Sequence, residues 1–100
     1  EIKVGALTVS TANRSAVLEG EHLALTSAEF DLLAVLALHA GRVLSREQLL
    51  RLVRGSDAET FDRAVDVQVS RLRQKLSARP AGATMIRTVR GAGYMLTAGD

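Results

Sequence analysis

Residues 61–76 read FDRAVDVQVSRLRQKL, and their pattern decides what kind of fold the chain adopts. Placed on a helix at about 100° per residue, the apolar side chains gather on one narrow stripe. The opposite face carries basic and polar side chains together with one valine. The stripe consists of Phe61, Val65, Val69, Leu72 and Leu76, and the opposite face of Arg63, Val67, Ser70, Arg71 and Gln74, with Arg73 and Lys75 on its flanks.

The first half of this segment also alternates apolar and polar residues, as a strand does. Valines at 65, 67 and 69 are separated by Asp66 and Gln68, which is a period of two. The second half, RLRQKL, lacks that alternation and is rich in strong helix formers. Because the helical period fits the whole segment, we predict a helix over about residues 61–77.

The exposed face predicted for this helix suits the major groove of duplex DNA. Arginine and glutamine can form bidentate hydrogen bonds to guanine and adenine edges, and a small apolar side chain can meet a thymine methyl group. Many amphipathic helices have a charged face simply because that face is in water. The helix alone therefore leaves both interpretations open.

Charge is distributed unevenly along the chain. The 100 residues suit one domain, and a formal net charge of +2 is too small to indicate nucleic-acid binding by itself. From Arg63 to Arg90, however, seven basic residues stand against one acid, Asp66. Such a basic surface is typical of a phosphate-binding face. The absence of cysteine excludes disulfides and thiolate metal sites, and no apolar run is long enough to span a membrane.

The N-terminal half contains strand and helix-start signals. Residues 1–25 read as three or four short strands: apolar residues alternate in 2–4 and 7–9, and apolar runs at 16–18 and 23–25 flank the turn sequence EGE. The sequences TSAE at 26–29 and SREQ at 45–48 are capping boxes, which begin helices. The first helix is apolar over much of its circumference and ends near Gly41, so we expect it in the centre of the core. The second is short and stops at Gly55.

The C-terminal part reads as a β-hairpin. Met85 to Val89 and Tyr94 to Thr97 flank the turn sequence RGAG at 90–93, in which glycines allow positive φ or a close approach. A short helix, a turn and a basic helix outline a helix-turn-helix. A hairpin directly after the basic helix is the wing of a winged helix.

Three segments resemble the C-terminal effector domain of OmpR/PhoB-type response regulators, and most closely its OmpR- and CpxR-like branch. They are LTSAEFDLLAVLALHAGRVLSREQLL at 25–50, FDRAVDVQVSRLRQKL at 61–76 and IRTVRGAGYML at 86–96. The resemblance covers nearly the whole chain. It implies an α+β winged helix-turn-helix with an N-terminal antiparallel four-stranded sheet, three helices and a C-terminal β-hairpin wing. We expect a single domain over 1–100, with strands in 1–25, a helical core in 26–79 and the wing in 84–98.

The same resemblance implies sequence-specific binding of double-stranded DNA by a two-component response regulator that controls transcription in the cytoplasm. A receiver domain, absent here, would precede Glu1, and a sensor kinase would be its partner. The fragment would be a monomer that can bind direct repeats as a head-to-tail dimer. The third helix would enter the major groove and the wing the minor groove, and a loop could face RNA polymerase. The residues of that loop are Ser56, Asp57, Ala58, Glu59 and Thr60.

Carried over position by position, the resemblance implies base contacts from the exposed helix face, backbone contacts from its flanks, and wing contacts. The helical pattern adds Ser70 and Gln74. Two positions depart from the family: Arg54 replaces a frequent tryptophan, and Met95 replaces a frequent basic residue. The expected DNA-contacting residues are Arg63, Val67, Gln68, Ser70, Arg71, Arg73, Gln74, Lys75, Thr88 and Arg90.

Other functions are less well supported by the residues. A protein-binding winged helix is the alternative, and it should expose more aromatic or aliphatic side chains than Val67 alone. No set of nucleophile, base and orienting group indicates an enzyme. The two histidines, His22 and His39, lie far apart, and the acidic residues at 57, 59 and 62 lack the glycine and closing glutamate of a calcium loop. We therefore expect no cofactor and no metal, and we expect Asp66 to pair with Arg63 or Arg73.

Overall fold

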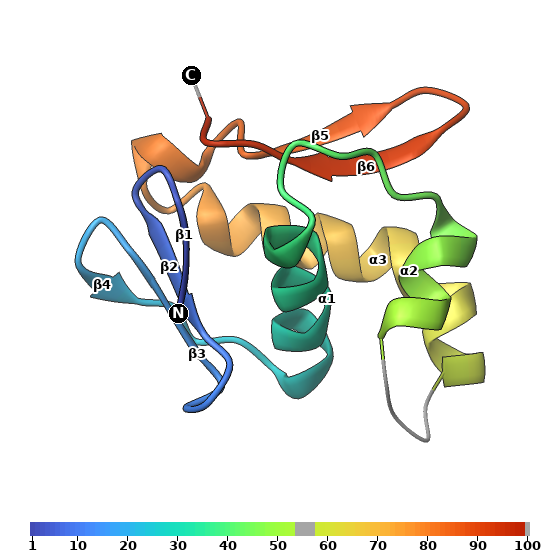
Figure 1. Cartoon of the computed structure of the whole chain (residues 1–100), viewed down its shortest axis with the longest axis horizontal. Helices are drawn as coiled ribbons and strands as arrows, with labels where there is room; N and C mark the ends of the chain where they lie inside the picture. The colour runs from blue at the N-terminus through green and yellow to red at the C-terminus, as the bar shows by residue number, and fades with distance from the viewer. Residues whose placement is uncertain (54–57, 100) are drawn as a thin grey trace.

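A computed structural model describes the backbone of residues 1–53 and 58–99, and the side chains of these residues outside 58–64. Within them an N-terminal sheet, three helices and a C-terminal hairpin are present, as predicted for a winged helix-turn-helix (Figure 1). The elements are β1 (Ile2–Val4), β2 (Leu7–Ser10), β3 (Ser15–Leu18), β4 (Glu21–His22), α1 (Ser27–Leu38), α2 (Arg46–Leu52), α3 (Ala58–Leu76), the short 3-10 helix η1 (Pro80–Gly82), β5 (Ile86–Val89) and β6 (Gly93–Leu96).

The four N-terminal strands form an antiparallel sheet in the order β1-β2-β3-β4. Alternate residues of β2 and β3 face the core, with Leu7 opposite Leu18 in the register. The strand predicted at 23–25 is wrong, because β4 is only Glu21–His22. After it the chain leaves the sheet, and Leu23 and Leu25 pack against the core while the backbone crosses to α1.

α1 is the central helix: it stands between the N-terminal sheet and α2, and α3 crosses it (Figure 1). Its predicted capping box is present: Thr26 Oγ1 accepts a hydrogen bond from the Glu29 backbone N–H at 3.2 Å, and Glu29 Oε1 accepts one from the Thr26 N–H at 2.9 Å. Its apolar residues are buried on nearly every side, including all those from Leu32 to Ala37. The prediction of a central core helix is therefore confirmed.

α3 places its apolar stripe in the core, as its sequence pattern predicts. Val65, Val69, Leu72 and Leu76 are buried, whereas Val67 is 46% exposed. The helix begins at Ala58 rather than near residue 61, so 58–60 belong to the helix and not to the preceding loop. Alanine and glutamate are strong helix formers, and they extend the helix backwards.

β5 and β6 form the wing, and the hydrogen bonds of Leu44 add a third segment to it. The Leu44 N–H donates to the Tyr94 carbonyl at 2.8 Å, and the Tyr94 N–H donates to the Leu44 carbonyl at 2.9 Å. Gly93 has φ +145° and pairs with Val89, and a Cβ there would lie 2.0 Å from the Leu44 oxygen. Gly91 has φ +77° at the turn. The expected uses of these glycines, close approach and positive φ, are both confirmed.

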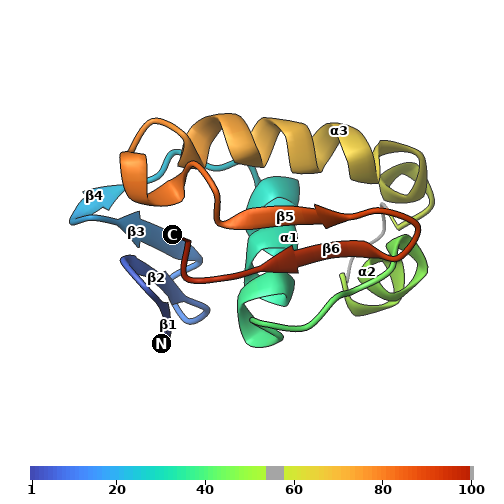
Figure 2. The same ribbon diagram turned by 90° about the horizontal axis from the view of Figure 1, so that it is seen from above.

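The wing lies beside α3 and runs along it, and its turn points toward α2 (Figure 2). The N-terminal sheet lies at the other end of α3, beyond η1. Three segments distant in the sequence, α2, α3 and the wing, therefore come together at one end of the molecule.

The two faces of α3 should differ sharply in their tolerance of truncation. We expect Leu72→Ala to lower the free energy of unfolding by about 2–5 kcal/mol, because it opens a cavity in the core. Val67→Ala on the exposed face should change it by about 0.5 kcal/mol or less. Urea unfolding of both variants measures the difference, and equal losses would mean that α3 is seated differently.

Candidate nucleic-acid interface

The face of α3 that points away from the core is open along the described part of the helix. Val67, Ser70, Arg71 and Gln74 are all exposed, as the sequence predicts. Arg90 is exposed at the wing turn. The four residues of α3 form the open face. Together with Arg90 they offer guanidinium, amide, hydroxyl and methyl groups, which are the groups that read base edges and contact phosphates.

One flank of α3 faces the wing and is used for internal contacts. Arg73 Nε donates to the Ile86 carbonyl at 3.2 Å, and its Nη2 donates to Thr88 Oγ1. The same guanidinium lies 5.7 Å from the centre of the Tyr94 ring. Arg73 was expected to contact the DNA backbone, but in this structure its donors hold the wing, and the Thr88 hydroxyl is one of its acceptors.

Asp66 lies on the same flank, two turns before Arg73. Its Oδ1 accepts a hydrogen bond from the Tyr94 hydroxyl, and its Oδ2 lies 3.4 Å from Nη2 of Arg46. The expected pairing with Arg73 is therefore wrong, because the adjacent wing and α2 supply closer partners. Burial and the hydrogen bond to Asp66 raise the pKa of Tyr94 above its ordinary value, so the phenol is a donor at neutral pH.

The other flank of α3 faces the start of α1. Lys75 Nζ donates to Glu29 Oε1 at 2.6 Å and to the Ala24 carbonyl at 2.6 Å. Lys75 was expected to contact phosphate, but its ammonium is the partner of a carboxylate whose side chain is only 3% exposed. Burial by itself would raise the pKa of Glu29, but hydrogen bonds from Lys75 and Thr26, with the Lys75 charge, outweigh it and lower that pKa below its ordinary value. Gln68, expected at the backbone, is half-buried, and its Oε1 is buried without a hydrogen-bond partner.

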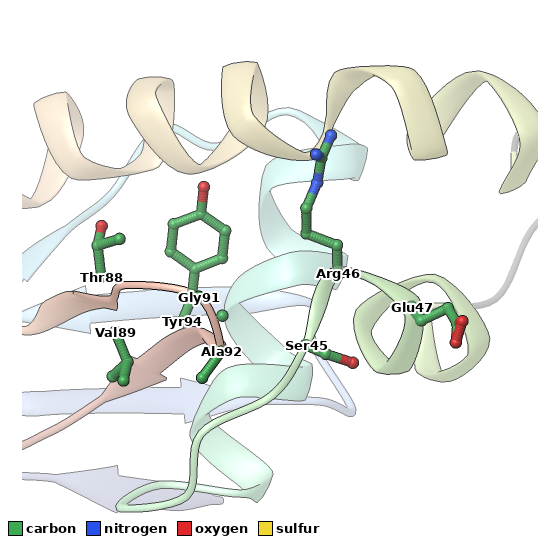
Figure 3. Close-up of a pocket in the computed structure, with 9 residues that line it drawn as sticks. Ser45, Arg46, Glu47, Thr88, Val89, Gly91, Ala92 and Tyr94 are labelled. Atoms are coloured by element: carbon green, nitrogen blue, oxygen red, sulfur yellow. The ribbon is translucent and has the colours of Figure 1, made fainter.

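An open cleft of about 440 Å³ separates the wing turn from the start of α2 (Figure 3). It is lined by residues 45–47 and by wing residues 88–89 and 91–94. The side chains of Arg46 and Tyr94 point from its two sides toward α3. The cleft therefore lies beside the two residues that contact Asp66, Arg46 and Tyr94.

Some predicted features fall outside the described part of the chain. These are Ser56 and Asp57 of the loop expected to face RNA polymerase, the stop at Gly55, and the departure at Arg54. The side chains of residues 58–64, which include Ala58, Glu59, Thr60, Phe61, Asp62 and Arg63, are outside it as well. Among the residues that the structure describes, no group of acidic, histidine or cysteine side chains is arranged to hold a metal ion. None of the helices described there has the length and apolar character needed to cross a membrane.

Sequence reasoning missed three side chains that organise this interface. Glu29 was interpreted only as a cap, Arg46 only as part of a capping box, and Tyr94 only as a strand residue. The signal available was Asp66, a single acid within a long basic stretch. A lone carboxylate there requires partners, but the sequence pattern does not show that they come from α2 and the wing.

Comparison with known proteins gives consistent matches. Residues 20–96 match the family described as transcriptional regulatory protein, C terminal. The chain is 42% identical over 95 residues to the transcriptional regulatory protein CpxR of Escherichia coli, covering 95% of the chain and 41% of CpxR. It is 48% identical over 95 residues to PrrA of Mycobacterium tuberculosis, covering 95% of the chain and 40% of PrrA. The chain thus spans about two fifths of the length of these relatives.

A solved structure matches over almost the whole chain. It is the RstA DNA-binding domain of Klebsiella pneumoniae in complex with the RstA box, with 43% identity and a TM-score of 0.80. The match covers 97% of this chain and 96% of that one. The likeness therefore extends from the N-terminal sheet through the wing.

The Lys75–Glu29 pair predicts a pH-dependent loss of stability. Replacing Lys75 by Met leaves the buried Glu29 carboxylate without its counter-charge. We expect a loss of about 1–3 kcal/mol at neutral pH, a range that allows for the partial solvent screening of Lys75. The pKa of Glu29 in the folded protein lies below its ordinary value of 4.5. The stabilisation by the Lys75–Glu29 pair is therefore complete above the ordinary pKa and is lost as the pH falls through the folded-state pKa.

The difference in free energy of unfolding between the parent and Lys75→Met should therefore become smaller as the pH is lowered. Urea unfolding at a series of pH values measures it. Arg79→Met is the matched control, because it removes a cation from the exposed pair with Glu21 and should cost about 0–1 kcal/mol. A Lys75→Met variant as stable as the parent at neutral pH, or a loss that does not change with pH, would contradict this assignment.

Proposed function

The chain belongs to the family of C-terminal domains of transcriptional regulatory proteins, and from this membership we propose that it binds double-stranded DNA in a sequence-specific way. The observation that carries the proposal is the open face, where Arg71, Gln74, Ser70 and Val67 are exposed together beside Arg90 of the wing. The chemistry of these groups suits base edges and phosphates. The matched RstA domain, in complex with the RstA box, supports the same conclusion.

In this proposal α3 enters the major groove and the wing reaches the minor groove or its phosphates. Arg63, Val67, Ser70, Arg71 and Gln74 contact base edges or adjacent phosphates. Arg90 supplies the wing contact. Four other residues of the expected DNA-contacting set have different roles in this proposal. Arg73 and Thr88 hold the wing, Lys75 pairs with Glu29 at the start of α1, and Gln68 is half-buried.

The alternative, a protein-binding winged helix, is less well supported by the character of the open face. Val67 is the one aliphatic side chain among its described residues, and it stands among hydroxyl, amide and guanidinium groups. Protein interfaces are typically enriched in aromatic residues at their centre. The open face carries none among those residues.

For the larger protein we propose an effector domain of a two-component response regulator that acts in the cytoplasm. A receiver domain and a cognate sensor kinase would control it, and a head-to-tail dimer would bind direct repeats. The chain, residues 1–100, would act there as one DNA-binding domain. The relatives support this proposal because they are transcriptional regulators of which the chain covers only about two fifths.

Selection of bound duplexes from a random library is the direct test of the proposed function. Enrichment of one short motif supports it and also reports the half-site. Recovery of bound duplexes with no enriched motif would contradict sequence-specific recognition. Failure to retain any duplex at low salt would overturn DNA binding.

Arg71 should read a base. We expect Arg71→Ala to cost about 1–3 kcal/mol on the selected duplex and to relax the preference at one base position. Arg87→Ala is the matched control: it removes the same charge from β5, one residue before Thr88 and hence on the opposite face of the wing. Titration of variant duplexes distinguishes the two. Full affinity and unchanged preference in Arg71→Ala would remove α3 from the major groove.

Arg90 should contact phosphate rather than sequence. We expect Arg90→Ala to weaken binding to all duplexes alike and to lower the slope of log K against log salt by about 0.9, the value for one phosphate contact. Lys75→Met should leave that slope unchanged, since its ammonium is already paired with Glu29. The comparison is a salt titration of the parent and both variants. An unchanged slope in Arg90→Ala would take this residue out of the phosphate contacts.

A further inference from the structure

We infer that the hydrogen bond between Tyr94 and Asp66 is a positioning contact that fixes the wing relative to α3, so that both bind one duplex together. We name this contact the wing link. The inference rests on the proposed function, since it concerns how two DNA-contacting surfaces are held at one relative position. Neither residue is assigned a base or phosphate contact. Each acts through its neighbours, Val67 beside Asp66 and Arg90 at the end of the wing.

Such a contact matters for the wing because residues 90–92 of its turn are exposed. The cleft of about 440 Å³ lies between the turn and the start of α2 (Figure 3). The base of the hairpin is buried through Ile86 and Leu96, and farther out its support comes from Leu44, which pairs with Tyr94, and from the flank of α3. A two-stranded hairpin has little stability alone, so these lateral contacts set its direction.

Tyr94 is the residue at which the lateral contacts meet. Its backbone pairs with Leu44, its ring lies below the Arg73 guanidinium, and its hydroxyl donates to Asp66. Because Asp66 and Arg73 stand two turns apart on α3, they hold the wing at two points. Arg73 holds β5 through Ile86 and Thr88, and the Tyr94 hydroxyl adds a contact from β6 to an earlier turn of α3.

The wing link is a different kind of contact from the ion pair beside it. Arg46 and Asp66 approach to 3.4 Å, and their side chains are 53% and 56% exposed. Exposed pairs of this kind contribute little. The Tyr94 phenol is half-buried and donates to the same carboxylate, and a hydrogen bond to a charged acceptor is stronger than one between neutral groups. The test is therefore directed at the hydroxyl of Tyr94.

The wing link predicts energetic coupling between the wing tip and α3. When the wing link holds the wing in place, Arg90 can contact DNA with no further loss of conformational entropy. Without the link, the wing must become ordered on binding, and this ordering lowers the affinity. Removing Arg90 should then matter less in a protein that lacks the link. A structural residue that merely stabilises the fold would leave the effect of Arg90→Ala unchanged.

The test is a double-mutant cycle on the duplex selected by the parent chain. Affinities are measured for the parent, Tyr94→Phe, Arg90→Ala and the double variant. Phenylalanine keeps the ring and the strand pairing and removes only the hydroxyl. We expect Tyr94→Phe to weaken binding and to reduce the fold-loss caused by Arg90→Ala by about twofold or more, the lower range for residues in one network.

A second cycle with Asp66→Ala removes the same contact from the α3 side and should give the same reduction. Ser77→Ala is the control, because this hydroxyl donates to the Arg73 carbonyl at 2.7 Å and does not touch the wing. In its double-mutant cycle with Arg90→Ala, the fold-losses in affinity of the two single variants should multiply to give that of the double variant. Thermal unfolding of each variant confirms that the compared proteins are folded.

The outcomes separate this inference from the proposed function. If the parent binds its duplex and Arg90→Ala causes the same fold-loss in every background, the wing link does not position the wing. Parent-like affinity of Tyr94→Phe would overturn the inference in the same way. If the parent binds no duplex, the proposed function fails and the inference fails with it.

Discussion

The seating of α3 on α1 determines which side chains the molecule presents to a partner. Val65, Val69, Leu72 and Leu76 are buried along one stripe, and Lys75 is joined to the buried carboxylate of Glu29 at the start of α1. The apolar stripe sets the rotation of the helix, because turning it would expose the core. The ion pair sets its position along α1, because sliding would leave Glu29 unpaired. With both set, the exposure of Arg71 and Gln74 follows.

The charges of this chain serve two purposes, and the structure separates them. On the flanks of α3, Asp66, Arg73 and Lys75 are paired with the wing, α2 and α1. The open face and the wing turn carry Arg71 and Arg90. A net charge of only +2 is therefore compatible with the proposed DNA binding, since the arrangement of a few arginines on one side matters more than the total.

Local patterns predicted most of the fold. Capping boxes located the starts of α1 and α2, and the period of apolar residues located the buried side of α3. The errors lie where tertiary contacts override local preference. Leu23 and Leu25 fill the core on the way to α1 and do not extend a strand. The DNA-backbone contacts that the family resemblance implies for Arg73 and Lys75 stay predictions, and in the free protein both cations have partners within the chain. A helical pattern separates only inside from outside. It does not show that the wing and the buried Glu29 provide their partners.

The most direct test of the central claim, that the open face of α3 and the wing turn bind DNA, is an NMR titration of the chain with its selected duplex. We expect changes in backbone amide chemical shift to concentrate on residues 67–74 and on the wing turn at 88–92, with small changes in the N-terminal sheet. Shifts centred on the sheet or on the exposed ends of α1 and α2 at Leu38 and Leu52, with the open face unchanged, would contradict it.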